Sequence, residues 1–231
     1  MAQTAQQHVP STERPAGSYA LLAATIVYVA LIIAALAMAG TLPAAAETGA
    51  QVVAWFREHR GAMLAATWAF TVATLPLAVM IALLRAMLPA LYRDVFTIGG
   101  VAVLVCGAVQ IWFWAGLALH ADRLDPAIAR TVLDVAVFFG PVLTGATTTM
   151  IGPVTLLALR RRAGLPMWLG LLGAVAFIEQ SIETITIFGT TGFTQPGGAM
   201  NLELGASLTL AWMLAFGLWA GLRGRMVESL A

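Results

Sequence analysis

The sequence predicts an all-α protein, a polytopic membrane bundle of six transmembrane helices whose N- and C-termini are both cytoplasmic. The first observation is composition: 60% of the 231 residues are hydrophobic and 10% are charged, whereas soluble domains carry about 25% charged residues. The second is length, because six apolar runs each reach the roughly 20 residues that a helix needs to cross a bilayer. The third is the shortness of the connections, none of which could form a soluble domain.

The six apolar runs are expected to cross the membrane in chain order. They cover residues 18–39, 61–84, 97–119, 131–159, 166–188 and 204–222. We expect a disordered cytoplasmic tail at 1–16, because this segment is polar and contains two prolines. The transmembrane domain then takes 17–223 and a short cytoplasmic tail takes 224–231. The first run has the small-residue ending of a secretory signal but exceeds a signal core in length, so we interpret it as an uncleaved span.

Arginine sets the expected orientation, because cytoplasmic loops are enriched in positive charge. The sequence contains no lysine, and all 12 cationic residues are arginines. A cytoplasmic N-terminus places on the inside Arg14, Arg85, Arg93, Arg160, Arg161, Arg162, Arg223 and Arg225. It leaves on the outside Arg57, Arg60, Arg123 and Arg130. A bacterial cytoplasmic membrane with both termini inside is therefore expected.

Several of the expected helices carry interruptions. The segment 50–63 has apolar residues on one face and charges on the other, which is typical of an interfacial stretch that runs into the second span. The fourth span contains two Gly-Pro steps, at Pro141 and Pro153, and proline kinks a helix. Threonines 147–149 could satisfy the carbonyls that these prolines free. The bend either packs closely or opens a cavity, and the Gly-rich loop 189–201 is either a lid or a connector.

Two acids, Glu179 and Glu183, interrupt the apolar fifth span one helical turn apart. At 1.5 Å per residue, Glu179 lies roughly 20 Å along the helix, in the outer half of the bilayer. Thr186 continues their face, and Gln180 begins an adjacent polar strip. Intramembrane acids usually face the bundle interior and mark a functional site. Two carboxylates this close in a poor dielectric are not expected to be ionised together, so one should hold a proton.

Other polar and aromatic residues are expected at the same depth. They are Gln110, Trp112 and Trp114 on the third span, Asp134 and Phe139 on the fourth, and Trp212 on the sixth. Each has a structural alternative. Asp134 could pair with Arg130 on the surface, Gln110 could hold two helices together, and the tryptophans could form an interfacial belt.

Composition and motif searches exclude several classes of function. A net charge of +1 gives no reason to expect a nucleic-acid partner. Cys106 is the single cysteine and there are three histidines, so we expect no disulfide framework, no metal site and no cofactor. The metalloprotease and hydrolase signatures HExxH and GxSxG are absent. Without lysine, no retinal Schiff base can form, which excludes the rhodopsins.

Four stretches together resemble a group of uncharacterised actinobacterial six-helix membrane proteins. They are "VVAWFREHRGAML", "LDPAIARTVLDV", "LPMWLGLLG" and "FGTTGFTQPGGAMNLELGASLTLAWMLAFG". The resemblance covers about residues 17–222 and implies the six-helix fold and a bacterial inner membrane. It implies no activity, because the group is a domain of unknown function.

The leading hypothesis is an acid-catalysed enzyme acting on an apolar isoprenoid or lipid, similar in chemistry and size to small membrane-bound terpene cyclases. Glu179 would be the general acid, with Glu183 or Asp134 tuning its proton. The substrate-binding wall would hold Gln110, Trp112, Trp114, Phe139, Gln180 and Trp212. Two alternatives stay open: a proton-coupled transporter of a small molecule, and a non-catalytic subunit whose acids are satisfied internally. The expected partners are an apolar small molecule or lipid and the membrane lipids, and not a nucleic acid; the transporter would carry a small hydrophobic or cationic compound.

Overall fold

The computed structural model describes residues 16–223, which are helical with short connections and no strand. The two expected tails lie outside the described residues, apart from Ala16. The helices are α1 Ala16–Ala39, α2 Gly49–Glu58, α3 Arg60–Arg85, α4 Ala90–His120, α5 Pro126–Val137, α6 Phe139–Leu159, α7 Met167–Glu183 and α8 Ala206–Arg223. Between α7 and α8 lie the 3-10 helices η1 Thr184–Phe188 and η2 Gly192–Thr194 and the π-helix η3 Met200–Gly205.

Six segments are long and apolar enough to cross a membrane, as the sequence predicts. They are Gly17–Ala39, Arg60–Arg85, Ala90–His120, Pro126–Leu159, Met167–Phe188 and Met200–Arg223. The fourth consists of α5 and α6, and the last two include η1 and η3. The chain therefore has the fold of a multi-pass integral membrane protein. Each segment is within a few residues of its expected bounds, except that the third and fourth begin earlier.

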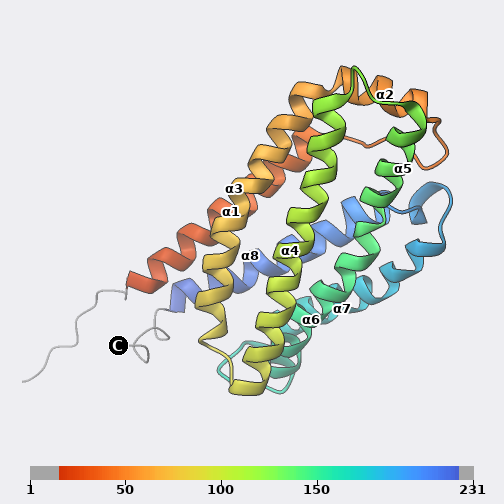
Figure 1. Ribbon diagram of the computed structural model, residues 1–231. Helices are drawn as coiled ribbons and strands as arrows, with labels where there is room; N and C mark the ends of the chain where they lie inside the picture. The colour runs from red at the N-terminus through yellow and green to blue at the C-terminus, as the bar shows by residue number, and fades with distance from the viewer. Residues whose placement is uncertain (1–15, 224–231) are drawn as a thin grey trace, which may run out of the picture.

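The six spans form a ring in which each one contacts its neighbours in the chain, and α8 closes the ring against α1. Figure 1 shows α2 and the α4–α5 connection at one end of the bundle, and the α3–α4 and α6–α7 turns at the other. We name these the upper and lower ends. The start of α1 and the finish of α8 lie together at the lower end, where Gly221 approaches Leu22 and the backbone of Ser18.

The α2 helix is a separate element that packs on protein, which corrects the expectation of an interfacial stretch running into the second span. Thr48 and Gln51 form a capping box at its start, and the chain breaks at His59 before α3 begins. Its apolar face, Val52, Val53 and Phe56, is buried in a core cluster with α5 and the end of α4. The amphipathic pattern therefore reflects packing of α2 on the upper end of the bundle.

The fourth span bends at Phe138, between α5 and α6, while Pro153 lies inside an unbroken α6. The hydroxyls of threonines 147–149 donate to backbone carbonyls of residues 143–145. A proline frees the carbonyl four residues earlier, which belongs to Val137 and Thr149. The expectation that these threonines compensate for the prolines is therefore wrong, because their hydroxyls reach one turn back and no further.

Small residues allow the close helix contacts that lipid-embedded bundles require. A Cβ on Gly99 of α4 would lie 2.4 Å from the Met150 nitrogen of α6. A Cβ on Gly217 of α8 would lie 2.2 Å from the Thr25 hydroxyl of α1. The helices on each side could accommodate a methyl group only by moving apart.

Substitution of Gly99 by alanine is therefore expected to lower the free energy of unfolding by about 1–3 kcal/mol, the usual cost of overpacking. Gly107→Ala on the same helix is the matched control, because no atom lies within 4 Å of its added Cβ. Reversible unfolding in bicelles measures both variants. Equal stability of the two would contradict the close contact between α4 and α6.

Candidate functional site

The structure places both acids of α7 inside the bundle. Glu179 is 8% exposed, Gln180 is 4% exposed and Glu183 is 3% exposed. Thr186 on η1 continues this face and is fully buried, whereas Thr184 is exposed and donates to the Ser181 carbonyl. A carboxyl group in such surroundings needs hydrogen-bond donors from the protein.

One amide group joins the two acids. The Gln180 side-chain nitrogen donates to Glu179 Oε2 at 3.0 Å and to Glu183 Oε2 at 2.5 Å. Its oxygen accepts a hydrogen bond from the Thr147 hydroxyl of α6. Glu179 Oε1 is buried and has no partner among the described residues. The two carboxyl groups therefore depend on a single shared NH2 group.

Asn201 of η3 completes the environment of Glu183. Its side-chain nitrogen donates to Glu183 Oε1 at 2.5 Å and lies 3.3 Å from the Thr186 hydroxyl. Its oxygen accepts from the Gly197 backbone N–H at 2.9 Å. Because a backbone N–H can only donate, this bond fixes the orientation of the amide. Both oxygens of Glu183 consequently accept amide N–H groups.

Interrupted helices bring these groups together. The π-helix η3 carries both Asn201 and Gly205, and π segments are frequent at functional sites. A Cβ on Gly205 would lie 2.1 Å from Glu183 Oε2 and 2.7 Å from the Gln180 nitrogen. A Cβ on Gly140, just after the α5–α6 break, would lie 3.2 Å from the Asn201 side chain. The two glycines thus leave the space that the polar network occupies.

A cavity of about 170 Å³ opens beside this network in the centre of the helix ring. Its wall is mostly apolar and draws on all six spans. The four aromatic residues that line it are Tyr28, Phe70, Trp114 and Phe139, and the polar ones include Gln110, Thr147, Gln180, Glu183 and Asn201. Along α4 it runs from Val103 to Trp114, roughly 16 Å at 1.5 Å per residue. Below it, Phe96 and Phe216 stack edge to face with ring centroids 6.2 Å apart.

Five of the nine expected site residues line the cavity and four do not. Glu183, Gln180, Gln110, Trp114 and Phe139 contribute to its wall. Trp112 is 69% exposed and points away from the bundle. Side chains two positions apart on a helix differ in direction by about 200°, so Trp112 and Trp114 cannot face the same side. Trp212 is buried deeper, against Phe216 at 5.5 Å between ring centroids. Glu179 does not line the wall, although it shares the Gln180 amide with Glu183.

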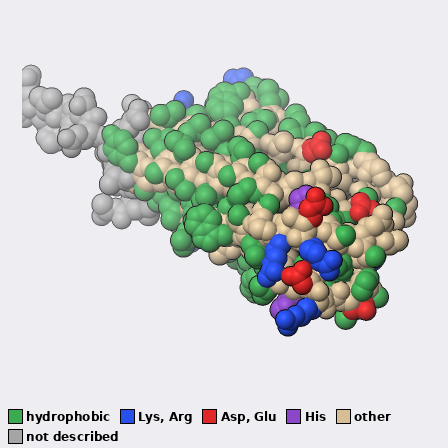
Figure 2. All heavy atoms as spheres, turned by 90° about the horizontal axis from the view of Figure 1, so that it is seen from above, with side chains coloured by type: hydrophobic (Ala, Val, Ile, Leu, Met, Phe, Trp, Pro, Cys, Tyr) green, Lys and Arg blue, Asp and Glu red, His purple; other side chains and the backbone are tan. Residues whose placement is uncertain are grey.

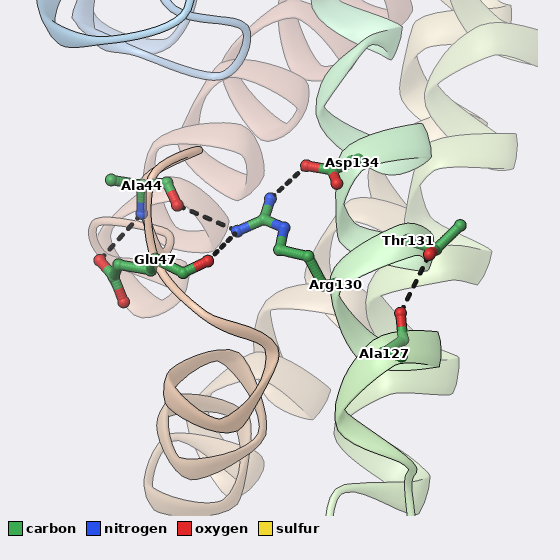
Figure 3. Close-up of polar contacts among 6 residues, drawn as sticks. All are labelled: Ala44, Glu47, Ala127, Arg130, Thr131 and Asp134. Atoms are coloured by element: carbon green, nitrogen blue, oxygen red, sulfur yellow. Dashed lines mark hydrogen bonds and ion pairs between the residues drawn. The ribbon is translucent and has the colours of Figure 1, made fainter.

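Asp134 does not join the other acids. It accepts from Arg130 at 2.5 Å, the surface pairing that the i,i+4 spacing allows. Arg130 also donates to the backbone carbonyls of Ala44 at 3.0 Å and Glu47 at 3.4 Å. Figure 3 shows this guanidinium between α5 and the loop before α2. The pair therefore anchors a connection at the upper end and contributes nothing to the cavity.

No arginine or histidine pairs with either buried acid among residues 16–223. The ion pairs of this part of the chain join Arg57 and Arg60 to Asp122, Arg93 to Asp94, and Arg130 to Asp134. Figure 2 shows basic and acidic side chains close together at the upper end, with hydrophobic side chains covering the flank beside them. Nor do three His, Cys, Asp or Glu side chains within these residues gather closely enough to hold a metal ion.

Comparison of the chain with protein-family models, with curated protein sequences and with solved structures gave no match. The resemblance to actinobacterial six-helix proteins therefore stays a prediction. What the chain does has to be argued from the cavity and the polar network on its wall.

Substitution of Asn201 by leucine, which has a similar volume, should leave Glu183 Oε1 and the Gly197 N–H without partners. Each unsatisfied buried group costs about 1–3 kcal/mol, so we expect the free energy of unfolding to fall by at least that amount. Ser181→Ala, on the exposed face of α7, is the control and should have little effect. In the double-mutant cycle with Glu183→Leu, additive effects of the two substitutions would contradict the bond between them.

Proposed function

We propose that this protein is a membrane carrier for a small, predominantly apolar molecule, which it holds in the central cavity against Glu183. The observation that supports this most is the combination of a mostly apolar cavity wall with a few converging polar groups at one side. Ligand sites in proteins have this construction, in which the apolar wall supplies contact and the polar groups fix orientation.

The backbone around the cavity also favours a carrier. The fourth span is broken at Phe138 beside the site, while the fifth span ends in η1 and the sixth begins in η3. Transporters commonly build their binding sites from such discontinuous helices near the middle of the membrane. Irregular backbone at this depth is tolerated where protein or a cavity surrounds it. A change in these segments could open the cavity without unfolding the rest of the ring.

The size of the cavity limits the ligand. An apolar cavity of about 150 Å³ accommodates benzene, and this one measures about 170 Å³. The matching ligand is a single ring or a short branched chain with one polar group.

The second candidate is the acid-catalysed enzyme on a small isoprenoid. It is favoured by the position of Glu183 on the same wall as the aromatic rings of Trp114 and Phe139, because aromatic faces stabilise a carbocation. In this case Glu183, and not Glu179, would contact the substrate. Against it stand the two amide donors, which occupy both oxygens from which a general acid would deliver its proton.

Filling the cavity tests the binding site without touching the polar network. Gly107 of α4 lines the cavity, and an added Cβ there meets no atom within 4 Å. We expect tert-butylbenzene to raise the thermal midpoint of the wild type, and Gly107→Leu to lose this shift. Gly116→Leu is the control, because it lies on the same helix in open space and does not line the cavity.

The comparison is made in one detergent, so that partitioning of the probe into micelles is the same for all three proteins. An equal ligand-induced shift in the wild type and in Gly107→Leu would contradict the cavity as the binding site. Absence of a shift in all of them would contradict the proposed function.

A further inference from the structure

We infer that the molecule carried in the cavity is a monovalent organic cation, which enters in exchange for one proton held by Glu179 and Glu183. This rests on the proposed carrier function and adds the class of the ligand and the ion that is exchanged for it. The inference comes from the charge balance of the polar network, taken together with the aromatic wall beside it.

The protein supplies no positive charge to the two acids. The amides of Gln180 and Asn201 donate to the acids, and the hydroxyls of Thr147 and Thr186 bond to these amides. Gly205 of η3 offers no side chain, and Glu203 of the same segment is exposed. From the other spans, the groups nearest the cavity are the uncharged Tyr28 and Gln110. All other charged side chains of the described region belong to the two ends.

Burying an ionised carboxylate without a cation costs several kcal/mol, and charge-assisted hydrogen bonds offset part of that cost. Glu183 receives two amide N–H groups, whereas Glu179 receives one and leaves Oε1 without a partner. With three amide N–H···O bonds and no cation between them, the two acids therefore hold one negative charge and one proton as a pair. A second negative charge is stable in the site only when a positive charge enters beside it.

The cavity places that charge beside Glu183. A cation in the cavity meets the carboxylate of Glu183 and the aromatic side chains of Trp114 and Phe139, and aromatic rings attract cations through their quadrupoles. The apolar substituents of the cation then contact the aliphatic side chains of the cavity wall. Among residues 16–223 no three His, Cys, Asp or Glu side chains gather to hold a metal ion, whereas Ca²⁺ takes six to eight oxygen ligands that usually include carboxylates. An anion would meet only the carboxylate's repulsion.

Electroneutrality explains the exchange. When the cation binds, the pair of acids releases its proton by way of Glu183, which lines the cavity, and the total charge of the site is unchanged. The Gln180 amide, which donates to both acids, connects the two events through one residue. A cation that enters a bilayer must lose its hydration, and a buried carboxylate offsets part of that cost.

The test uses phenyltrimethylammonium and its neutral isostere tert-butylbenzene, which differ in the charge of one atom. We expect the full-length protein in nanodiscs to bind the cation more tightly as the pH rises, with affinity changing up to tenfold per pH unit where one proton is exchanged. Binding of the neutral probe should not depend on pH. Calorimetry in buffers of different ionisation enthalpy counts the protons released.

Two variants separate the roles of the acids. Glu183→Gln should weaken cation binding on the order of 30-fold or more, the usual effect of removing one partner of a buried charge pair, and should leave tert-butylbenzene binding unchanged. Glu179→Gln should still bind the cation but release no proton. The pH series on the wild type tests the exchange of a proton for the cation even if a variant does not fold.

The outcomes distinguish the inference from the proposed function. If both probes bind equally well, or if the cation binds without pH dependence and without proton release, the inference is wrong while the binding site stands. If neither probe binds, the proposed function fails, and the inference fails with it.

Discussion

The side-chain amide of Gln180, bonded to two buried carboxyl groups at once, is the contact on which the functional part of this bundle depends. It lies between Glu179 and Glu183 on α7 and is held from α6 by Thr147. Asn201 holds the far side of Glu183 from η3. Three spans thus meet at one polar cluster inside a ring that is otherwise apolar. Without these donors, two acids at this depth would be among the most destabilising groups in the protein.

The helices next to that cluster are irregular. An unbroken α-helix through η3 would change the direction in which Asn201 and Gly205 point, because the π segment inserts an extra residue into the turn. The break at Phe138 allows Gly140 to approach Asn201. The lower half of the ring is, by contrast, regular and closely packed around Phe96, Trp212 and Phe216. A regular scaffold below and interrupted helices above suit a protein whose upper part changes conformation.

Much of this architecture could be predicted from the sequence. Apolar length gave six spans, and the four-residue spacing of Glu179 and Glu183 put them on one face. The sequence could not show which of the two acids lines the cavity, since that depends on the rotation of α7 against five other helices. It also could not separate Trp112 from Trp114 without that rotation. Asn201 lies at the end of the expected loop 189–201, and its role depends on a π-helix that has no recognised sequence signal.

The most direct measurement of the central claim is the infrared spectrum of the buried carboxyl groups in the protein without ligand. The account predicts an absorption band of a protonated, weakly hydrogen-bonded carboxyl group that is present in the wild type and absent from Glu179→Gln. Such a band is expected because the two buried acids share the Gln180 amide, have no cationic partner among the described residues, and hold one proton between them. Persistence of the band in Glu179→Gln, together with its loss in Glu183→Gln, would contradict the account.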